Sequence, residues 1–69
     1  MKNNNLLTEF GAQVRKERLK QNLSQEELAT KADVHRTYIG MVERAEKNIT
    51  LKTIKKIADA LNVEISHFF

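Results

Sequence analysis

The sequence predicts an all-α fold, a compact bundle of five helices that forms a single domain over residues 1–69. Proline is absent and there are only two glycines, which favours helices over a turn-rich sheet. Apolar residues recur at helical spacing, and no segment shows the strict alternation of a strand. The Asn-rich residues 1–5 are expected to be flexible. A chain this short buries only about 60% of its unfolded surface, so self-association is an expected source of further stability.

The composition argues against several classes of function. The chain has no Cys, which removes thiol catalysis and Cys-based zinc sites and suits a reducing cytoplasm. No apolar run approaches the roughly 20 residues of a membrane span. There is no glycine-rich phosphate loop, Ser–His–Asp signature or paired metal-ligand set. We therefore expect no enzyme activity, metal, cofactor or small-molecule ligand. The net charge of +3 points modestly toward nucleic acid.

The first helix is expected over residues 6–21. Leu7, Phe10 and Val14 form a stripe at helical spacing, and Arg18 continues the same face. The second helix begins sharply, because Ser24 with Glu27 three positions later forms a capping box. Its apolar face comprises Leu28, Ala29 and Ala32.

The third helix is expected over residues 35–44, with Tyr38, Ile39 and Val42 facing inward. The fourth begins at a Thr50 cap and ends at Asn62, a residue type that tolerates the left-handed conformation. A short helical turn over residues 64–69 closes the bundle. It carries three large apolar side chains, Ile65, Phe68 and Phe69.

The link between the second and third helices, "ADVH", is very short. So short a link forces a sharp crossing, and Asp33 lies where the chain must reverse through a left-handed conformation. Two helices that cross at about 90–120° through a short turn form a helix-turn-helix. The alternative is a simple corner in a helical bundle.

The outward side of the third helix distinguishes these two readings. Its outward residues are expected to be Arg36, Thr37, Gly40, Met41 and Arg44. Arg can pair bidentately with guanine, Thr can bond base edges, and Met can only pack. Gly costs about 1 kcal/mol of helix stability relative to Ala, which makes sense if something must come close. The alternative is a solvated face that tolerates one Gly.

The segment "FGAQVRKERLKQNLSQEELATKADVHRTYIGMVERAEKNITLKTIKKIADALNV" resembles the phage-repressor (Cro-like, xenobiotic-response-element type) helix-turn-helix family over nearly the whole chain. The resemblance implies a lambda-repressor-like DNA-binding domain. Within the family, "HRTYI…ER…KNITL" and the "FF" ending are most similar to controller proteins of restriction–modification systems. Those proteins are small homodimeric transcription factors.

The resemblance also implies roles for individual residues. Base contacts fall to Arg36, Thr37 and Met41, with His35 as a secondary candidate. Arg18 and Glu43 match an ion pair that joins the first helix to the third. Phosphate contacts fall to Ser24, Gln25, Tyr38, Arg44, Lys47, Asn48 and Thr50.

The expected partner is double-stranded DNA with a palindromic or pseudo-palindromic operator, read by a homodimer in the cytoplasm at the bacterial nucleoid. Ile65, Phe68 and Phe69 are the expected dimer interface; alternatively they close the monomer's own core. Two alternatives share the fold, a phage-type or conjugative-element repressor and the antitoxin of a toxin–antitoxin operon. A third, of another class, is a protein-interaction module.

Four residues depart from the family pattern. Glu17 lies where the family usually has an aliphatic residue, so the first helix must either expose it or pair it. Asp33 and Ala45 occupy positions where Gly is frequent. A left-handed Ala would cost about 1 kcal/mol, so the third helix is expected to end differently here. His35 replaces the usual small polar cap, and His67 is expected to be a surface residue.

Overall fold

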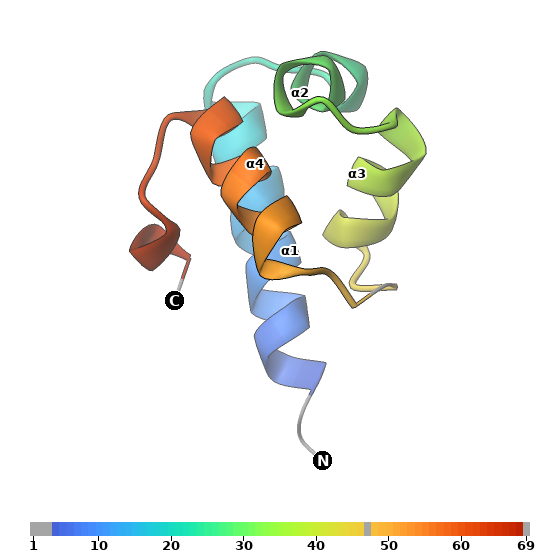
Figure 1. The fold of residues 1–69 in the computed structure, drawn as a ribbon, viewed down its shortest axis with the longest axis vertical. Coiled ribbons are helices and arrows are strands. Elements are labelled where there is room, and N and C mark those ends of the chain that lie inside the picture. The colour runs from blue at the N-terminus through green and yellow to red at the C-terminus, as the bar shows by residue number, and fades with distance from the viewer. Residues whose placement is uncertain (1–3, 47, 69) are drawn as a thin grey trace.

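The structure, a computed structural model, describes residues 4–46 and 48–68. Its described part contains the α-helices α1 (Asn4–Lys20), α2 (Gln25–Ala32), α3 (Arg36–Glu43) and α4 (Leu51–Leu61), followed by the 3₁₀ helix η1 (Ile65–His67) (Figure 1). The all-α fold is confirmed, but the predicted count of five helices is wrong. The last segment reaches only one short 3₁₀ turn.

The first helix begins two residues earlier than expected, because α1 starts at Asn4. Residues 1–3 lie outside the described residues.

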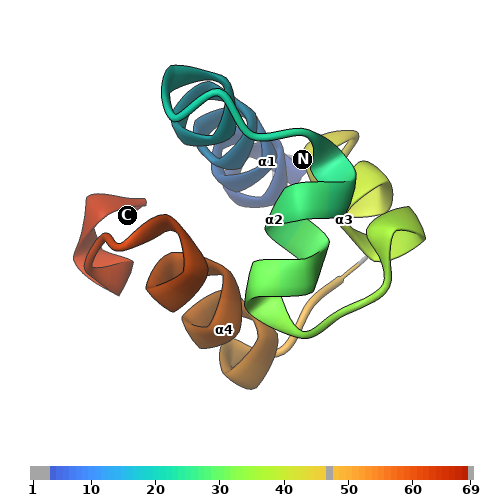
Figure 2. The ribbon, with the colours of Figure 1, turned by 90° about the horizontal axis from the view of Figure 1, so that it is seen from above.

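The four α-helices pack around one core. α1 and α4 lie side by side, α2 crosses above them, and α3 descends on the far side of α2 (Figures 1 and 2). Every helix contributes apolar side chains, as the helical spacing of the sequence requires. The fully buried ones of largest volume are Phe10, Val14, Leu28, Ile39, Ile57 and Leu61.

All four α-helices end in the same way, with a residue of positive φ. These residues are Asn22, Asp33, Ala45 and Asn62, with φ between 56° and 62°. In each case the next backbone N–H reaches back to a carbonyl five residues earlier, as Leu23 does to Arg18 and Glu46 to Met41. This is the hydrogen-bond pattern of the Schellman motif, which usually has Gly at the left-handed position. The chain therefore turns four times without using either of its two glycines.

Ala45 corrects the expectation for the end of α3. The helix does not end differently, because Ala45 itself adopts the left-handed conformation, with φ 56°. Its N–H bonds Val42, and the Glu46 N–H bonds Met41 at 2.9 Å. Asn and Asp tolerate this conformation through their short polar side chains, whereas Ala does not have that compensation. The end of α3 is thus a strained point in the backbone.

Gly11 brings α1 against the end of α3. A Cβ atom at Gly11 would meet the carbonyl oxygens of Val42 and Glu43. Both are backbone atoms and cannot swing aside, so any larger residue would push the two helices apart. Gly11 has an ordinary helical φ, and close approach is therefore the reason for its place.

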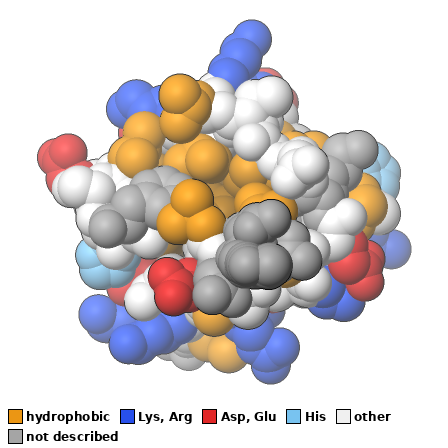
Figure 3. All heavy atoms as spheres, turned by 90° about the horizontal axis from the view of Figure 1, so that it is seen from below, with side chains coloured by type: hydrophobic (Ala, Val, Ile, Leu, Met, Phe, Trp, Pro, Cys, Tyr) orange, Lys and Arg blue, Asp and Glu red, His pale blue; other side chains and the backbone are white. Residues whose placement is uncertain are grey.

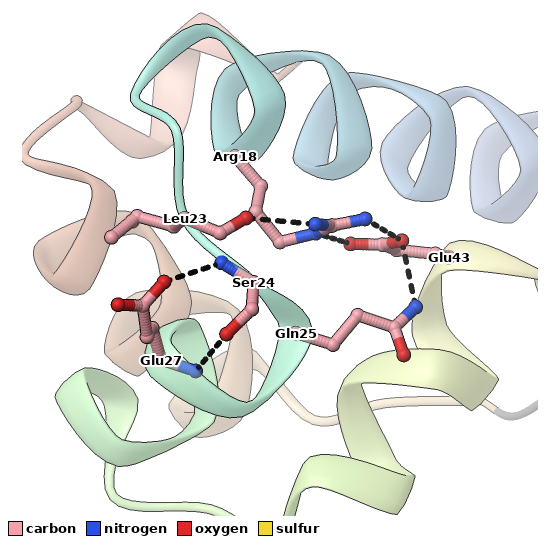
Figure 4. A network of polar contacts seen from close by, with 6 residues as sticks. All are labelled: Arg18, Leu23, Ser24, Gln25, Glu27 and Glu43. Atoms are coloured by element: carbon pink, nitrogen blue, oxygen red, sulfur yellow. Dashed lines mark hydrogen bonds and ion pairs between the residues drawn. The ribbon is translucent and has the colours of Figure 1, made fainter.

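One ion pair crosses the same junction (Figure 4). Arg18 donates from Nε and Nη2 to the Glu43 carboxylate, at 2.7 and 3.0 Å, and from Nη1 to the Leu23 carbonyl at 2.8 Å. Both side chains are buried, with 9% and 4% exposure. The hydrogen bond to Glu43 raises the pKa of the Arg18 guanidinium above its usual value. The pair ties α1 to α3, as the sequence stripe through Arg18 indicated.

The C-terminal turn is held against α1 by two contacts. The Phe68 ring packs edge-on against Phe10, with centroids 5.0 Å apart. His67 Nε2 lies 2.9 Å from a carboxylate oxygen of Glu17, whose side chain is only 7% exposed. Glu17 is therefore paired, and His67 is exposed as expected but also has a structural partner.

Phe68 was expected either in the dimer interface or in the monomer's own core, and the structure places it in the core. Phe68 is 5% exposed and belongs to the core of a single protomer. Ile65 is half-buried and packs against the same core. Phe69 lies outside the described residues.

Replacement of Ala45 by Gly is expected to raise the free energy of unfolding by about 1 kcal/mol. The left-handed conformation costs a non-Gly residue about 1–2 kcal/mol, and Gly avoids this cost. Gly also loses more backbone entropy on folding, which offsets part of the stabilisation. Tm should rise by about 4–8 °C per kcal/mol in a domain of this size. Ala12→Gly, at an exposed position inside α1, is the matched control and should lower Tm. An A45G protein that melts lower than wild type would contradict the strain.

Glu43→Ala is expected to lower the free energy of unfolding by about 3 kcal/mol, because it leaves the Arg18 guanidinium buried without its counter-ion. Urea denaturation measures the change. Asp59→Ala is the matched control, since it breaks an exposed pair with Lys55 (2.9 Å) and should cost less than about 1 kcal/mol. Equal losses in the two variants would show that burial of the Arg18–Glu43 pair contributes nothing.

Candidate nucleic-acid interface

A hollow of about 530 Å³ lies between the start of α2 and the outer side of α3. The hollow brings together members of the predicted base-contacting set and of the predicted phosphate-contacting set. Its lining residues are Arg18, Ser24, Gln25, Glu26, Arg36, Thr37, Gly40 and Arg44. Three of the eight are arginines, so the hollow suits an anion.

The start of α2 supplies hydrogen-bond donors to this hollow. Ser24 caps the helix, accepting from the Glu27 N–H at 3.0 Å, while the Glu27 carboxylate accepts from the Ser24 N–H at 2.8 Å. These bonds hold the pKa of Glu27 below its usual value. The Ser24 hydroxyl accepts in this cap and keeps its own proton to donate. The N–H groups of the first turn have no partner within the helix and favour an anion there.

The Gln25 side chain is oriented by the ion pair behind it (Figure 4). Its Nε2 donates to Glu43 Oε1 at 3.1 Å. A carboxylate only accepts, so the amide nitrogen must face Glu43 and the amide oxygen must face elsewhere. In this arrangement one N–H of the side-chain amide is engaged by Glu43, and the donors available to a phosphate oxygen are the backbone N–H of Gln25 and the second N–H of the amide.

The start of α3 presents the predicted base-contacting pair. Arg36 and Thr37 are exposed in the first turn of the helix. The Arg36 side chain forms no hydrogen bond or ion pair with any described part of the chain. His35 is the helix cap, because its Nδ1 accepts the Thr37 N–H at 3.1 Å. His35 thus caps α3 in place of the small polar residue that is usual at this position. The sequence did not suggest that the imidazole would act as the cap.

Gly40 was expected on the outward surface of the third helix, but it is buried. A Cβ atom on Gly40 would lie 3.1 Å from Arg44 Nη1 and 3.6 Å from Gln25 Oε1. The groups that come close to this glycine are therefore side chains of the protein itself. Arg44 in turn donates from Nε to Glu46 at 2.9 Å, which raises the pKa of Arg44.

The other predicted contact residues do not line the hollow. Tyr38 is half-buried and packs against the core, and Met41 is half-exposed. Asn48 is exposed in the loop before α4, and Thr50 caps α4 by accepting the Thr53 N–H at 3.1 Å. Lys47 lies outside the described residues.

Among the polar links that escaped the sequence reasoning, three lie at the ends of the helices: Gln25 to Glu43, Arg44 to Glu46, and Glu17 to His67. The first and last join residues 18 and 50 positions apart, so no local pattern could reveal them. The second joins near neighbours. Helical geometry would separate them, and only the left-handed turn at Ala45 allows the contact.

Two further features of the structure concern membrane insertion and metal binding. No helix in the described part of the chain has the length and apolar character needed to cross a membrane. Among the same residues, no group of three or more His, Cys, Asp or Glu side chains could hold a metal ion.

Comparison with known proteins identifies the family to which this fold belongs. Residues 14–68 match the helix-turn-helix family. The control protein C.BamHI of Bacillus amyloliquefaciens is 50% identical over 62 residues, which are 88% of this chain and 76% of that protein. The crystal structure of the restriction–modification controller protein C.AhdI from Aeromonas hydrophila has a TM-score of 0.88 at 41% identity, covering 91% of this chain and 96% of its own.

A second controller, C.Esp1396I, has been solved as a tetramer in complex with its natural 35 base-pair operator. It matches with a TM-score of 0.87 at 37% identity, over 94% of this chain and 86% of its own. The chain therefore belongs to the helix-turn-helix family and, within it, to the restriction–modification controller proteins.

Proposed function

We propose that the protein is a sequence-specific double-stranded DNA-binding transcriptional regulator, a homodimeric controller of a restriction–modification operon. The observation that carries the proposal is the hollow between α2 and α3. In it, the exposed Arg36 and Thr37 lie beside the capped start of α2 and the Arg44 guanidinium. Base-reading and phosphate-holding groups are thus on one surface. Such a regulator works in the cytoplasm, at the nucleoid.

In this mechanism α3 enters the major groove with its first turn foremost. Arg36 pairs bidentately with a guanine, and Thr37 contacts a neighbouring base edge or a thymine methyl group. α2 lies across the backbone, where Ser24 and the Gln25 N–H hold a phosphate. Asn48 and Thr50 add contacts to the DNA backbone beyond the end of α3. The sequence assigns Lys47 to the same group of contacts.

One protomer reads too few base pairs to discriminate against a genome, so a two-fold dimer is required. The dimer surface must come from apolar groups that one protomer leaves uncovered. On the face seen from below, hydrophobic side chains gather near the centre (Figure 3). In the region of α4 and η1, Leu51 is 74% exposed, and Val63 and Ile65 are half-buried. We assign this region to the dimer in place of Phe68.

A symmetric pair of this kind recognises a palindromic or pseudo-palindromic operator with half-sites about 34 Å apart, one turn of DNA. C.Esp1396I assembles as a tetramer on its 35 base-pair operator. By analogy, occupancy of the operator here rises with protein concentration through dimerisation. The sign of regulation then follows the position of the operator relative to the promoter.

Selection of bound duplexes from a random-sequence library, followed by footprinting, tests the proposal. The expected result is a two-fold motif with half-sites one turn apart, and an affinity that falls steeply with salt as counterions are released. Failure to enrich any motif, together with salt-independent binding, would contradict DNA recognition.

Arg36→Ala should weaken binding to the selected duplex by about 1–3 kcal/mol and relax the preference at one guanine of each half-site. Arg36→Lys keeps the charge but cannot pair bidentately, so it should lose the preference too. Arg15→Ala, which removes an equal charge from an exposed position on α1, is the control and should keep the preference. Fluorescence anisotropy with matched and guanine-substituted duplexes measures all three. If R36A weakened every duplex equally, Arg36 would not be reading a base.

A further inference from the structure

We propose that Glu46 is a positioning residue for DNA binding: together with Gly40, it holds the Arg44 guanidinium in the hollow where the DNA backbone passes. This inference rests on the proposed function. It assigns a favourable role to an acidic side chain beside a surface that must accept a polyanion. Glu46 and Gly40 act through Arg44, and neither touches the DNA.

The contact between Arg44 and Glu46 depends on the strained end of α3. Residues two apart on a helix do not face each other. Here Ala45 is left-handed, so the backbone reverses between the two residues, and Glu46 Oε2 lies 2.9 Å from Arg44 Nε. The Glu46 N–H is fixed by the Met41 carbonyl. The carboxylate therefore projects from a well-defined piece of backbone.

This ion pair contributes little to stability, because both side chains are more than half exposed, at 57% and 52%. Its effect is geometric. Glu46 takes the Nε–H of Arg44 and leaves the two terminal nitrogens to other partners. Arg44 lines the hollow, together with Gln25 and Arg36. Two parallel N–H groups of one guanidinium match two oxygens of a phosphate.

Gly40 provides the space for this arrangement. Arg44 lies one helical turn after Gly40, on the same face of α3. A Cβ atom at position 40 would lie 3.1 Å from Arg44 Nη1 and 3.7 Å from Nη2, so the guanidinium would have to move. A glycine here weakens the helix. The structure gives a reason for it, which is the place that the Arg44 guanidinium occupies.

The charge of Glu46 makes the inference sharply testable. Removal of a carboxylate near DNA ordinarily strengthens binding, since it removes repulsion from the phosphates. Glu26 provides this reference, because it lines the same hollow and its carboxylate pairs with no described residue. Glu26→Gln should therefore tighten binding to the selected duplex. Glu46→Gln should instead weaken it about threefold to tenfold, because a neutral amide oxygen holds the Arg44 Nε–H less firmly than a carboxylate does.

A double-mutant cycle with Arg44→Ala tests whether Glu46 affects DNA binding through Arg44. In the R44A background, E46Q should no longer weaken binding, since there is no guanidinium left to hold. E46Q and R44A should each also flatten the dependence of log affinity on log salt by about one phosphate contact, which loss of fold stability alone would not do. If E46Q tightened binding as E26Q does, or if the two losses simply added, Glu46 would not position Arg44.

Gly40→Ala gives an independent measurement. Ala favours the helix, so Tm should stay level or rise while the affinity for DNA falls, and the loss should disappear in the R44A background. A G40A protein with unchanged affinity would remove Gly40 from the arrangement. A wild-type protein that bound no duplex would overturn the proposed function and this inference together. Wild-type binding combined with an E46Q protein that behaves like E26Q would overturn this inference alone.

Discussion

The Arg18–Glu43 ion pair fixes the junction of three helices, and the DNA-facing geometry depends on it. Arg18 belongs to α1, Glu43 ends α3, and Gln25, at the start of α2, donates to the same carboxylate. Gly11 allows α1 and α3 to come close enough for the pair to form. A buried pair of this kind is weak evidence for stability, but it restricts the geometry: all three Arg18 nitrogens donate, and Glu43 Oε1 accepts from both Arg18 and Gln25. The hollow between α2 and α3 keeps its shape through this junction.

The helix ends show how a chain with two glycines makes four tight reversals. Three of the left-handed residues are Asn22, Asp33 and Asn62, whose side chains tolerate positive φ. The fourth is Ala45, which has no such compensation. That exception lies beside the hollow and brings Glu46 within reach of Arg44. Strain that collects next to a binding surface, and not at the far ends of the molecule, is what a functional constraint on the backbone would produce.

Local features of the sequence could be predicted well, because their causes are local. The capping box at Ser24, the Thr50 cap and the left-handed Asn62 each follow from residues within one turn. The stripe of apolar residues placed Arg18 on the inner face of α1. Features that depend on packing could not be predicted. Nothing local distinguishes Phe68 as a core residue, because its partner Phe10 is 58 positions away in sequence, and nothing local places Gly40 inside. The character of η1 depends likewise on Glu17, which holds His67 across the domain.

Acidic side chains organise this basic surface. Glu27 orders the first turn of α2, Glu43 orients Gln25, and Glu46 orients Arg44. Each of these carboxylates is already hydrogen-bonded within the protein, so its negative charge is partly balanced before any DNA arrives. Glu46 also leaves the two terminal nitrogens of Arg44 available to another partner. A flexible cation must lose side-chain entropy when it binds phosphate, and a cation that is already held has lost part of it in the free protein. The net charge of the domain is only +3. Orientation of a few donors therefore raises the affinity for DNA without additional positive charge. Under the proposed function, it also places the attraction on the surface that reads the sequence.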